Sequence, residues 1–116
     1  MQTYSETAII KFCTRCRLKI LVTGASGLLG RAVLAELHRD RHFETVGIAH
    51  SRAKGNLSRV DLLCKQEVDS FFEKTRPDCV IHCAAIRDPD VCIEKPELTN
   101  RLNVDSTRWL AEAALQ

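Results

Sequence analysis

Apolar residues along this chain alternate between short continuous runs and helical spacing, and that alternation predicts a fold. Short runs rich in β-branched residues predict strands over residues 18–23, 45–49, 60–63 and 79–84. Helical spacing predicts helices over about residues 27–39, around Val68, Phe71 and Phe72, and from Pro96 to the end. The second of these stops before Arg76-Pro77, because the residue before proline disfavours helix. This order is typical of a parallel sheet with helices on both faces and the first strand in the middle. We therefore expect a three-layer α/β fold that stops after its fourth strand and the following helix.

The first 17 residues differ from the rest because they are basic and show no periodicity. We expect residues 1–17 to be a disordered extension and residues 18–116 to be the N-terminal part of one domain. A weak organelle-targeting segment is the alternative for the extension. Cys13 and Cys16 have the spacing of a redox or zinc pair, but no second pair in the sequence completes a zinc site.

A glycine-rich segment, Thr23-Gly-Ala-Ser-Gly-Leu-Leu-Gly30, follows the first predicted strand and opens the first predicted helix. Gly24 permits a tight turn, Gly27 leaves the backbone open to a ligand, and Gly30 lets the helix pack close to the strand. Free N–H groups and the helix dipole stabilise phosphate charge at such a place. We predict a site for the pyrophosphate of a dinucleotide, with a glycine-rich turn that binds nothing as the alternative.

The end of the second predicted strand bears on which dinucleotide is bound. In NAD-binding proteins an acidic residue about 20 residues past the glycines contacts the ribose hydroxyls. Here the stretch is His50-Ser-Arg-Ala-Lys54, which contains no acid. Arg52 and Lys54 could pair with a 2′-phosphate, which favours NADP over NAD. A solvated basic loop is the alternative and leaves the choice open.

Composition and charge narrow the classes of partner and compartment. A net charge of +2 is too small for the basic surface of a nucleic-acid-binding protein. No apolar run approaches the roughly 20 residues that span a bilayer. Four of the six cysteines fall in or beside predicted core elements, so we expect reduced thiols in a cytoplasmic protein that binds neither nucleic acid nor membrane.

From about residue 18 onward, the chain resembles the extended or atypical short-chain dehydrogenase/reductase superfamily, whose NAD(P)-binding domain is Rossmann-type. The resemblance is carried by Val22-Thr-Gly-Ala-Ser-Gly-Leu-Leu-Gly30, Val60-Asp-Leu-Leu63, Val80-Ile-His-Cys-Ala-Ala85 and Leu102-Asn-Val-Asp-Ser-Thr107. Within the superfamily, residues 83–90 and the Leu-Asn-Val-Asp stretch are most similar to the regulatory beta subunits of methionine adenosyltransferase. The dTDP-4-dehydrorhamnose reductases come second. The first group implies a role in S-adenosylmethionine biosynthesis, with the methionine adenosyltransferase catalytic subunit as a partner.

The resemblance also implies cofactor contacts at individual positions. Phosphates would meet the glycine loop, the adenosine ribose and its phosphate the end of the second strand, adenine the third, and nicotinamide the fourth. The residues implied are, in that order, Ser26, Gly27, Leu28 and Leu29; His50, Ser51 and Arg52; Asp61 and Leu62; and Cys83 and Arg87. Simpler roles are open for three positions. Asp61 could cap the next segment, Cys83 could be a small buried apolar residue, and Asn103 could be either a structural or catalytic amide or an ordinary helix-surface one.

Reductases of this superfamily use a tyrosine and a lysine four residues later, as Y-x-x-x-K, to exchange a proton with the substrate. The only tyrosine here is Tyr4, and Ala8 stands four residues on. We therefore expect no hydride transfer from this chain alone. Two functions remain: a non-catalytic NADP-binding regulatory module, and a truncated NADP-dependent sugar-nucleotide reductase or epimerase. In either case the outer edge of the fourth strand would be open and apolar, which favours self-association.

Overall fold

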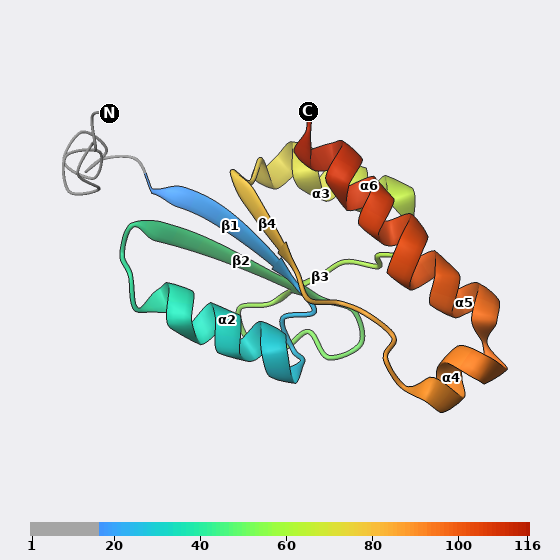
Figure 1. The fold of residues 1–116 in the computed structure, drawn as a ribbon. Helices are drawn as coiled ribbons and strands as arrows, with labels where there is room; N and C mark the ends of the chain where they lie inside the picture. The colour runs from blue at the N-terminus through green and yellow to red at the C-terminus, as the bar shows by residue number, and fades with distance from the viewer. Residues whose placement is uncertain (1–16) are drawn as a thin grey trace, which may run out of the picture.

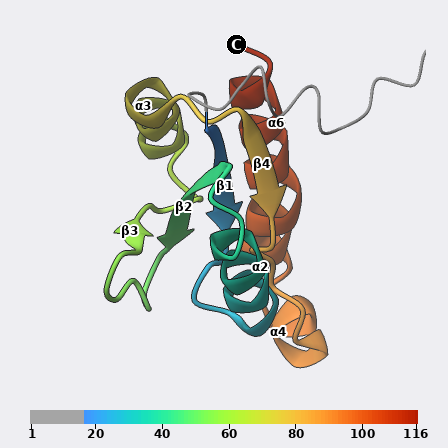
Figure 2. The same cartoon turned by 90° about the vertical axis from the view of Figure 1, so that its left-hand side faces the viewer.

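A computed structural model describes residues 17–116, which form one parallel four-stranded sheet and its helices (Figure 1). The strands are β1 (Leu18–Thr23), β2 (Phe43–Ala49), β3 (Ser58–Arg59) and β4 (Cys79–His82). Their order in the sheet is β3-β2-β1-β4, and every neighbouring pair is parallel (Figure 2). The predicted parallel sheet with an interior first strand is therefore confirmed.

The helices lie on both faces of the sheet, so the three-layer arrangement is also confirmed. They are α2 (Leu28–His38), α3 (Lys65–Thr75), α4 (Pro89–Glu94), α5 (Pro96–Asn100), η1 (Arg101–Asp105) and α6 (Ser106–Ala114). Leu34 of α2 packs with Ile20 and Val22 on one face. On the other face, Val68 and Phe72 of α3 and Leu110 of α6 pack against Leu21 and Ile48. Alternate residues of β1 therefore enter two different cores.

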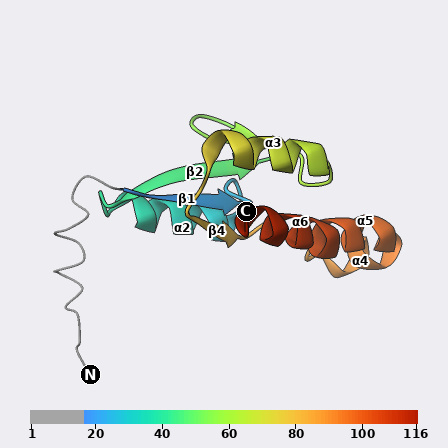
Figure 3. The same ribbon diagram turned by 90° about the horizontal axis from the view of Figure 1, so that it is seen from above.

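The predicted last helix is present, but it has a π-helical middle that the sequence did not indicate. Segments α5, η1 and α6 follow one another without a gap, and they extend with α4 beyond the strands (Figure 3). The short helix α4 was not predicted. The Asp88 carboxylate accepts the N–H of Asp90 at 2.9 Å, which satisfies an amide of the first turn.

The third strand was misplaced, because it covers residues 58–59 and not 60–63. The N–H of Val60 still donates to the carbonyl of Ala49, at 3.0 Å. The chain then turns, since the Asp61 carboxylate accepts the N–H of Leu63 at 2.9 Å and the Asp61 carbonyl accepts the N–H of Cys64 at 3.0 Å. The apolar character of this run reflects burial in the core beside α3, where Val60 and Leu62 lie.

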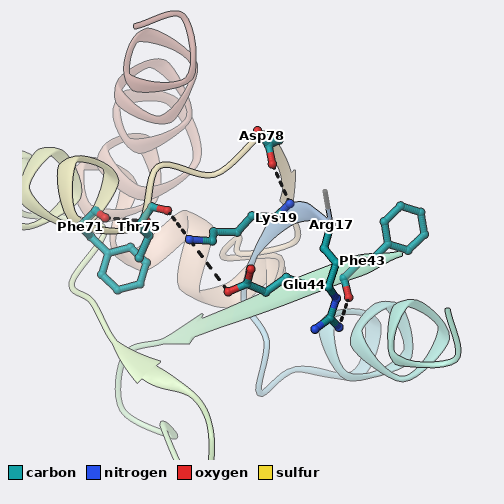
Figure 4. Close-up of polar contacts among 7 residues, drawn as sticks. All are labelled: Arg17, Lys19, Phe43, Glu44, Phe71, Thr75 and Asp78. Atoms are coloured by element: carbon teal, nitrogen blue, oxygen red, sulfur yellow. Dashed lines mark hydrogen bonds and ion pairs between the residues drawn. The ribbon is translucent and has the colours of Figure 1, made fainter. Parts of the chain in front are cut away.

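Polar contacts hold together the end of the sheet at which β1 and β4 begin, opposite the glycine segment (Figure 4). The N–H of Lys19 donates to the Asp78 carboxylate and the N–H of Asp78 donates to the Lys19 carbonyl, both at 2.8 Å. The Lys19 ammonium donates to the Thr75 carbonyl at 2.9 Å, at the C-terminus of α3. Arg17 donates to the Phe43 carbonyl at 2.9 Å. These bonds set where β4 begins beside β1.

Two further expectations concern the ends of the chain and the membrane. Apart from Arg17, the predicted extension lies outside the described residues, as does the Cys13–Cys16 pair. Within residues 17–116, no helix combines the length and the apolar character needed to cross a membrane.

Candidate functional site

The segments that follow the parallel strands meet at one edge of the sheet, where they surround a hollow of about 370 Å³. Ligands of open α/β sheets bind at this edge. Five predicted site residues line the hollow: Gly24, Ser26, His50, Asp61 and Leu62. The sequence did not single out the apolar residues that complete it, namely Ile48, Val60, Leu63, Ile86, Leu98 and Leu102. The hollow is thus polar toward the glycine segment and apolar toward α5 and η1.

The glycine segment makes a tight turn whose shape explains two of its glycines. Gly24 has φ +62°, a left-handed conformation that side chains disfavour. A Cβ at Gly24 would stand 2.7 Å from the backbone nitrogen of Ala84, so the turn lies directly against the end of β4. A Cβ at Gly30 would stand 2.1 Å from the carbonyl oxygen of Gly24, so α2 also packs against the turn. The predicted geometric roles of Gly24 and Gly30 agree with these contacts.

Gly27 has a different reason to be glycine. It is the N-cap of α2 with extended backbone angles, and a Cβ there would approach only the Gly24 carbonyl, at 3.3 Å. A side chain at Gly27 therefore requires the Gly24 carbonyl to move by only a few tenths of an ångström, which is far less than at Gly24 or Gly30.

The N-terminus of α2 presents N–H groups without protein acceptors. Within residues 17–116, the amides of Ser26, Leu28, Leu29 and Gly30 have no hydrogen-bond partner. The N-cap offers no side-chain acceptor, and the first turn holds no acidic residue. Helix N-termini of this kind favour anions through their free donors and the helix dipole. The side chains of Leu28 and Leu29 are 70% and 61% exposed, so they are not part of the core.

The end of β2 places three predicted residues at the rim of the hollow. His50 lines the hollow, and Ser51 and Arg52 follow it on the surface. Within the described residues, no carboxylate pairs with Arg52 or Lys54. Both cations are therefore available to an anionic ligand at this corner.

The turn after β3 gives Asp61 the local capping role and also places it at the hollow. Its carboxylate accepts the N–H of Leu63, as a local cap does, and its backbone N–H donates to the Glu67 carboxylate at 2.8 Å. The same residue lines the hollow beside Leu62. From η1, the Arg101 guanidinium donates to the Leu63 carbonyl at 3.3 Å, which joins this turn to the helical side of the hollow.

The structure does not bring Cys83 and Arg87 into the hollow. Cys83 packs against the apolar cluster beneath α2, and burial raises the pKa of its thiol. Its surroundings are those of a small apolar residue. Arg87 is exposed on the segment between β4 and α4. The neighbouring Ala84 and Ile86 face the hollow in their place.

Asn103 has a structural role that the sequence left open. From the π-helix η1, its side-chain oxygen accepts the N–H of Ile86 and its amide donates to the Ile86 carbonyl, both at 2.8 Å. This paired contact fixes the backbone of Ile86 at the wall of the hollow. Its only sequence signal was the Leu-Asn-Val-Asp stretch, since no spacing rule predicts the π-turn that presents Asn103.

Similarities to known proteins agree with this geometry. The NAD dependent epimerase/dehydratase family matches residues 20–116. Methionine adenosyltransferase 2 subunit beta from Pongo abelii is 40% identical over 96 residues, which are 83% of this chain and 28% of that protein. A hypothetical dTDP-4-dehydrorhamnose reductase from Sulfolobus tokodaii has a solved structure with a TM-score of 0.75 and 32% identity, covering 84% of this chain and 35% of that one. UDP-glucose 4-epimerase from Thermus thermophilus, solved with NAD, gives 0.73 and 30%, covering 83% and 33%.

The chain therefore spans about a third or less of the length of these relatives. The family match, in contrast, covers nearly all the residues that the structure describes. The parallel sheet and its glycine turn are those expected from the resemblance to extended short-chain dehydrogenases/reductases, which is confirmed. The chain belongs to the NAD dependent epimerase/dehydratase family.

Proposed function

We propose that this chain binds NADP and acts as a non-catalytic regulatory module. The observation that carries the proposal is the row of unpartnered amides at the N-terminus of α2, open beside Gly27 and continuous with the hollow. The pyrophosphate would lie on the amides of Ser26, Leu28, Leu29 and Gly30. Adenine would enter the apolar part of the hollow beside Leu62.

The preference for NADP rests on the rim at the end of β2. Arg52 and Lys54 supply two cations where an NAD-binding domain carries an acidic residue, and neither is paired with a carboxylate of the described residues. A 2′-phosphate would pair with the Arg52 guanidinium through two parallel hydrogen bonds. NAD, which lacks this phosphate, would bind the same turn more weakly.

The regulatory role rests on the similarity to methionine adenosyltransferase subunits beta. The proposed partner is the methionine adenosyltransferase catalytic subunit. Co-purification of the chain with that subunit, compared with an unrelated Rossmann domain of similar size, tests the partner. Failure to co-purify at micromolar concentrations would remove this half of the proposal.

A second candidate is that the chain is part of an NADP-dependent sugar-nucleotide reductase or epimerase, which the similarity to those structures favours. Both candidates predict NADP binding, so binding alone does not separate them. A longer form of the protein that carries Y-x-x-x-K and oxidises NADPH with a dTDP-4-dehydro sugar would favour the second. A longer form that binds NADP and the methionine adenosyltransferase catalytic subunit, but oxidises no NADPH, would favour the first.

The outer edge of β4 adds a proposal about assembly. β4 is the last strand of the sheet among the described residues, and its outer side pairs with no strand there. Such an edge favours pairing with another strand. We expect the 116-residue chain to self-associate as concentration rises, and sedimentation as a monomer at high concentration would contradict this.

A further inference from the structure

A partly buried chain of hydrogen bonds at the end of β4 is centred on His82. Thr23 and His82 are register partners on β1 and β4, and the Thr23 hydroxyl oxygen lies 2.6 Å from Nδ1 of His82. On the other side of the ring, Nε2 lies 3.0 Å from the hydroxyl oxygen of Thr107. One imidazole therefore joins the strand that precedes the glycine turn to α6, which continues directly from the η1 segment that lines the hollow.

The direction of each bond follows from what the Thr23 hydroxyl already accepts. Its oxygen accepts the N–H groups of Cys83 and Ala84, at 3.0 Å and 3.2 Å, which uses both of its acceptor positions. Its own proton must then go to Nδ1 of His82, so the ring proton is on Nε2 and is donated to Thr107. The Thr107 hydroxyl in turn donates to the Asn103 carbonyl at 2.8 Å. This series of hydrogen bonds is complete only when His82 is neutral.

Both ends of this chain reach the proposed site. Thr23 is followed by Gly24, whose Cα packs against the backbone of Ala84. Asn103 holds Ile86, which lines the hollow. The imidazole thus links the glycine segment to the wall of the hollow, although it lines neither of them itself.

Charged side chains of the described residues do not take part in this chain. The groups that meet the ring from β1 and from α6 are the Thr23 and Thr107 hydroxyls. The charged residues of the adjoining helical turn, Asp105 and Arg108, pair with each other at 3.4 Å. Burial alone lowers the pKa of His82, because it disfavours the charged imidazolium. Among residues 17–116, no carboxylate compensates a proton on this ring.

Resting on the proposed dinucleotide site, we propose that His82 is a positioning residue whose neutral ring holds the glycine turn against the helical cover, and whose protonation releases it. The imidazolium donates from both nitrogens. Thr23 would then face a third donor and would have to give up a bond to Cys83 or Ala84. Because Ala84 supports the Gly24 turn, acid would loosen the phosphate site and weaken dinucleotide binding.

The test is the affinity of the 116-residue chain for NADP from pH 8 down to the pH at which nitrogen-15 NMR shows the His82 ring protonated, measured by titration calorimetry for wild type, His82→Asn and His42→Asn. Asparagine keeps an acceptor for Thr23 but does not titrate. His42 is a matched control because it is a surface histidine paired with Asp40 at 2.6 Å. We expect the wild-type and His42→Asn proteins to lose about fivefold in affinity when the His82 ring is protonated, a loss of roughly one net hydrogen bond. His82→Asn should show no such loss.

An acid-weakened affinity that persists in His82→Asn would overturn the role of His82. Equal affinity of the wild type with the neutral and with the protonated His82 ring would overturn it as well.

A second measurement separates this inference from the proposed function. Nitrogen-15 NMR of the unliganded chain at pH 8 should show the Nε2–H tautomer of His82, with the amides of Cys83 and Ala84 exchanging faster as the ring titrates. An Nδ1–H tautomer would overturn the inference even if NADP binds. Amide exchange at Cys83 and Ala84 that does not change as the ring titrates would overturn it too. A folded chain with this tautomer and coupling but no NADP binding would instead refute the proposed function.

Discussion

Replacing Gly30 with alanine tests whether the glycine turn and α2 are packed as described. A Cβ at this position would stand 2.1 Å from the Gly24 carbonyl oxygen and 2.9 Å from Cα of Ala25. Both neighbours are backbone, so the clash can be relieved only by moving the turn or the helix. Inserting a methyl group into a packed site typically costs about 1–3 kcal/mol. The backbone contact here belongs at the upper end of that range.

Alanine also brings a gain, because it stabilises a helix interior by about 1 kcal/mol relative to glycine. The net expectation for Gly30→Ala is a loss of about 2 kcal/mol in the free energy of unfolding. For a chain of this size that corresponds to a fall of roughly 8 °C in Tm. Urea unfolding followed by circular dichroism measures it. A Gly30→Ala protein as stable as wild type would refute the packing on which the site depends.

Gly27→Ala provides the matched control, because the same methyl group is added three residues earlier. Its Cβ would lie 3.3 Å from one carbonyl oxygen, and the extended backbone there suits alanine. We expect the unfolding free energy of Gly27→Ala to stay within about 0.5 kcal/mol of wild type, as for most substitutions without a clash. Its affinity for NADP should nevertheless fall at least tenfold, because the methyl group occupies the phosphate position. Loss of stability in Gly27→Ala and not in Gly30→Ala would reverse the assignment.

Three further predictions concern single contacts. Arg76 ends α3 in the left-handed region at φ +46°, so Arg76→Gly should raise stability by about 0.5–1 kcal/mol in urea unfolding; a loss would contradict this. Asn103→Ala removes both bonds to Ile86 and should cost about 1–2 kcal/mol, whereas an unchanged midpoint would show that the clamp is unimportant. The lowered pKa of His82 means that the folded chain binds its proton less readily than the unfolded chain, so this contribution to stability is present above about pH 6.5 and is lost as pH falls through the folded pKa. A His82→Asn protein with the same acid-induced loss of stability would assign it to other groups.

The sequence predicted the parts of this fold that depend on local pattern. The strand Leu18–Thr23 is buried on both faces from Ile20 onward, so its apolar continuity marked the strand directly. The glycines at 24 and 30 were predictable because their backbone conformation and close packing admit no side chain. Pro77 likewise marked the end of α3, since the residue before proline disfavours helix.

Features that depend on distant contacts escaped that pattern. Val60 and Leu62 resembled a strand because they are apolar, but their burial comes from α3 and the Asp61 turn. Cys83, which follows β4, packs against the core beneath α2, and the local pattern did not show which side of the sheet it would meet. The hydrogen bonds from Thr23 through His82 to Thr107 join residues of β1, β4 and α6, which only folding brings together.

Titration of the purified 116-residue chain with NADP and with NAD, alongside Gly27→Ala, tests the central claim most directly. The unpartnered amides of α2 and the cations at Arg52 and Lys54 predict saturable binding that is tighter for NADP, with a rise in Tm that follows ligand concentration. Gly27→Ala should fold as wild type does, bind NADP at least tenfold more weakly and show a correspondingly smaller rise in Tm. A folded wild-type chain with no measurable affinity for either dinucleotide would contradict the account. Equal affinities of wild type and Gly27→Ala for NADP would contradict it as well.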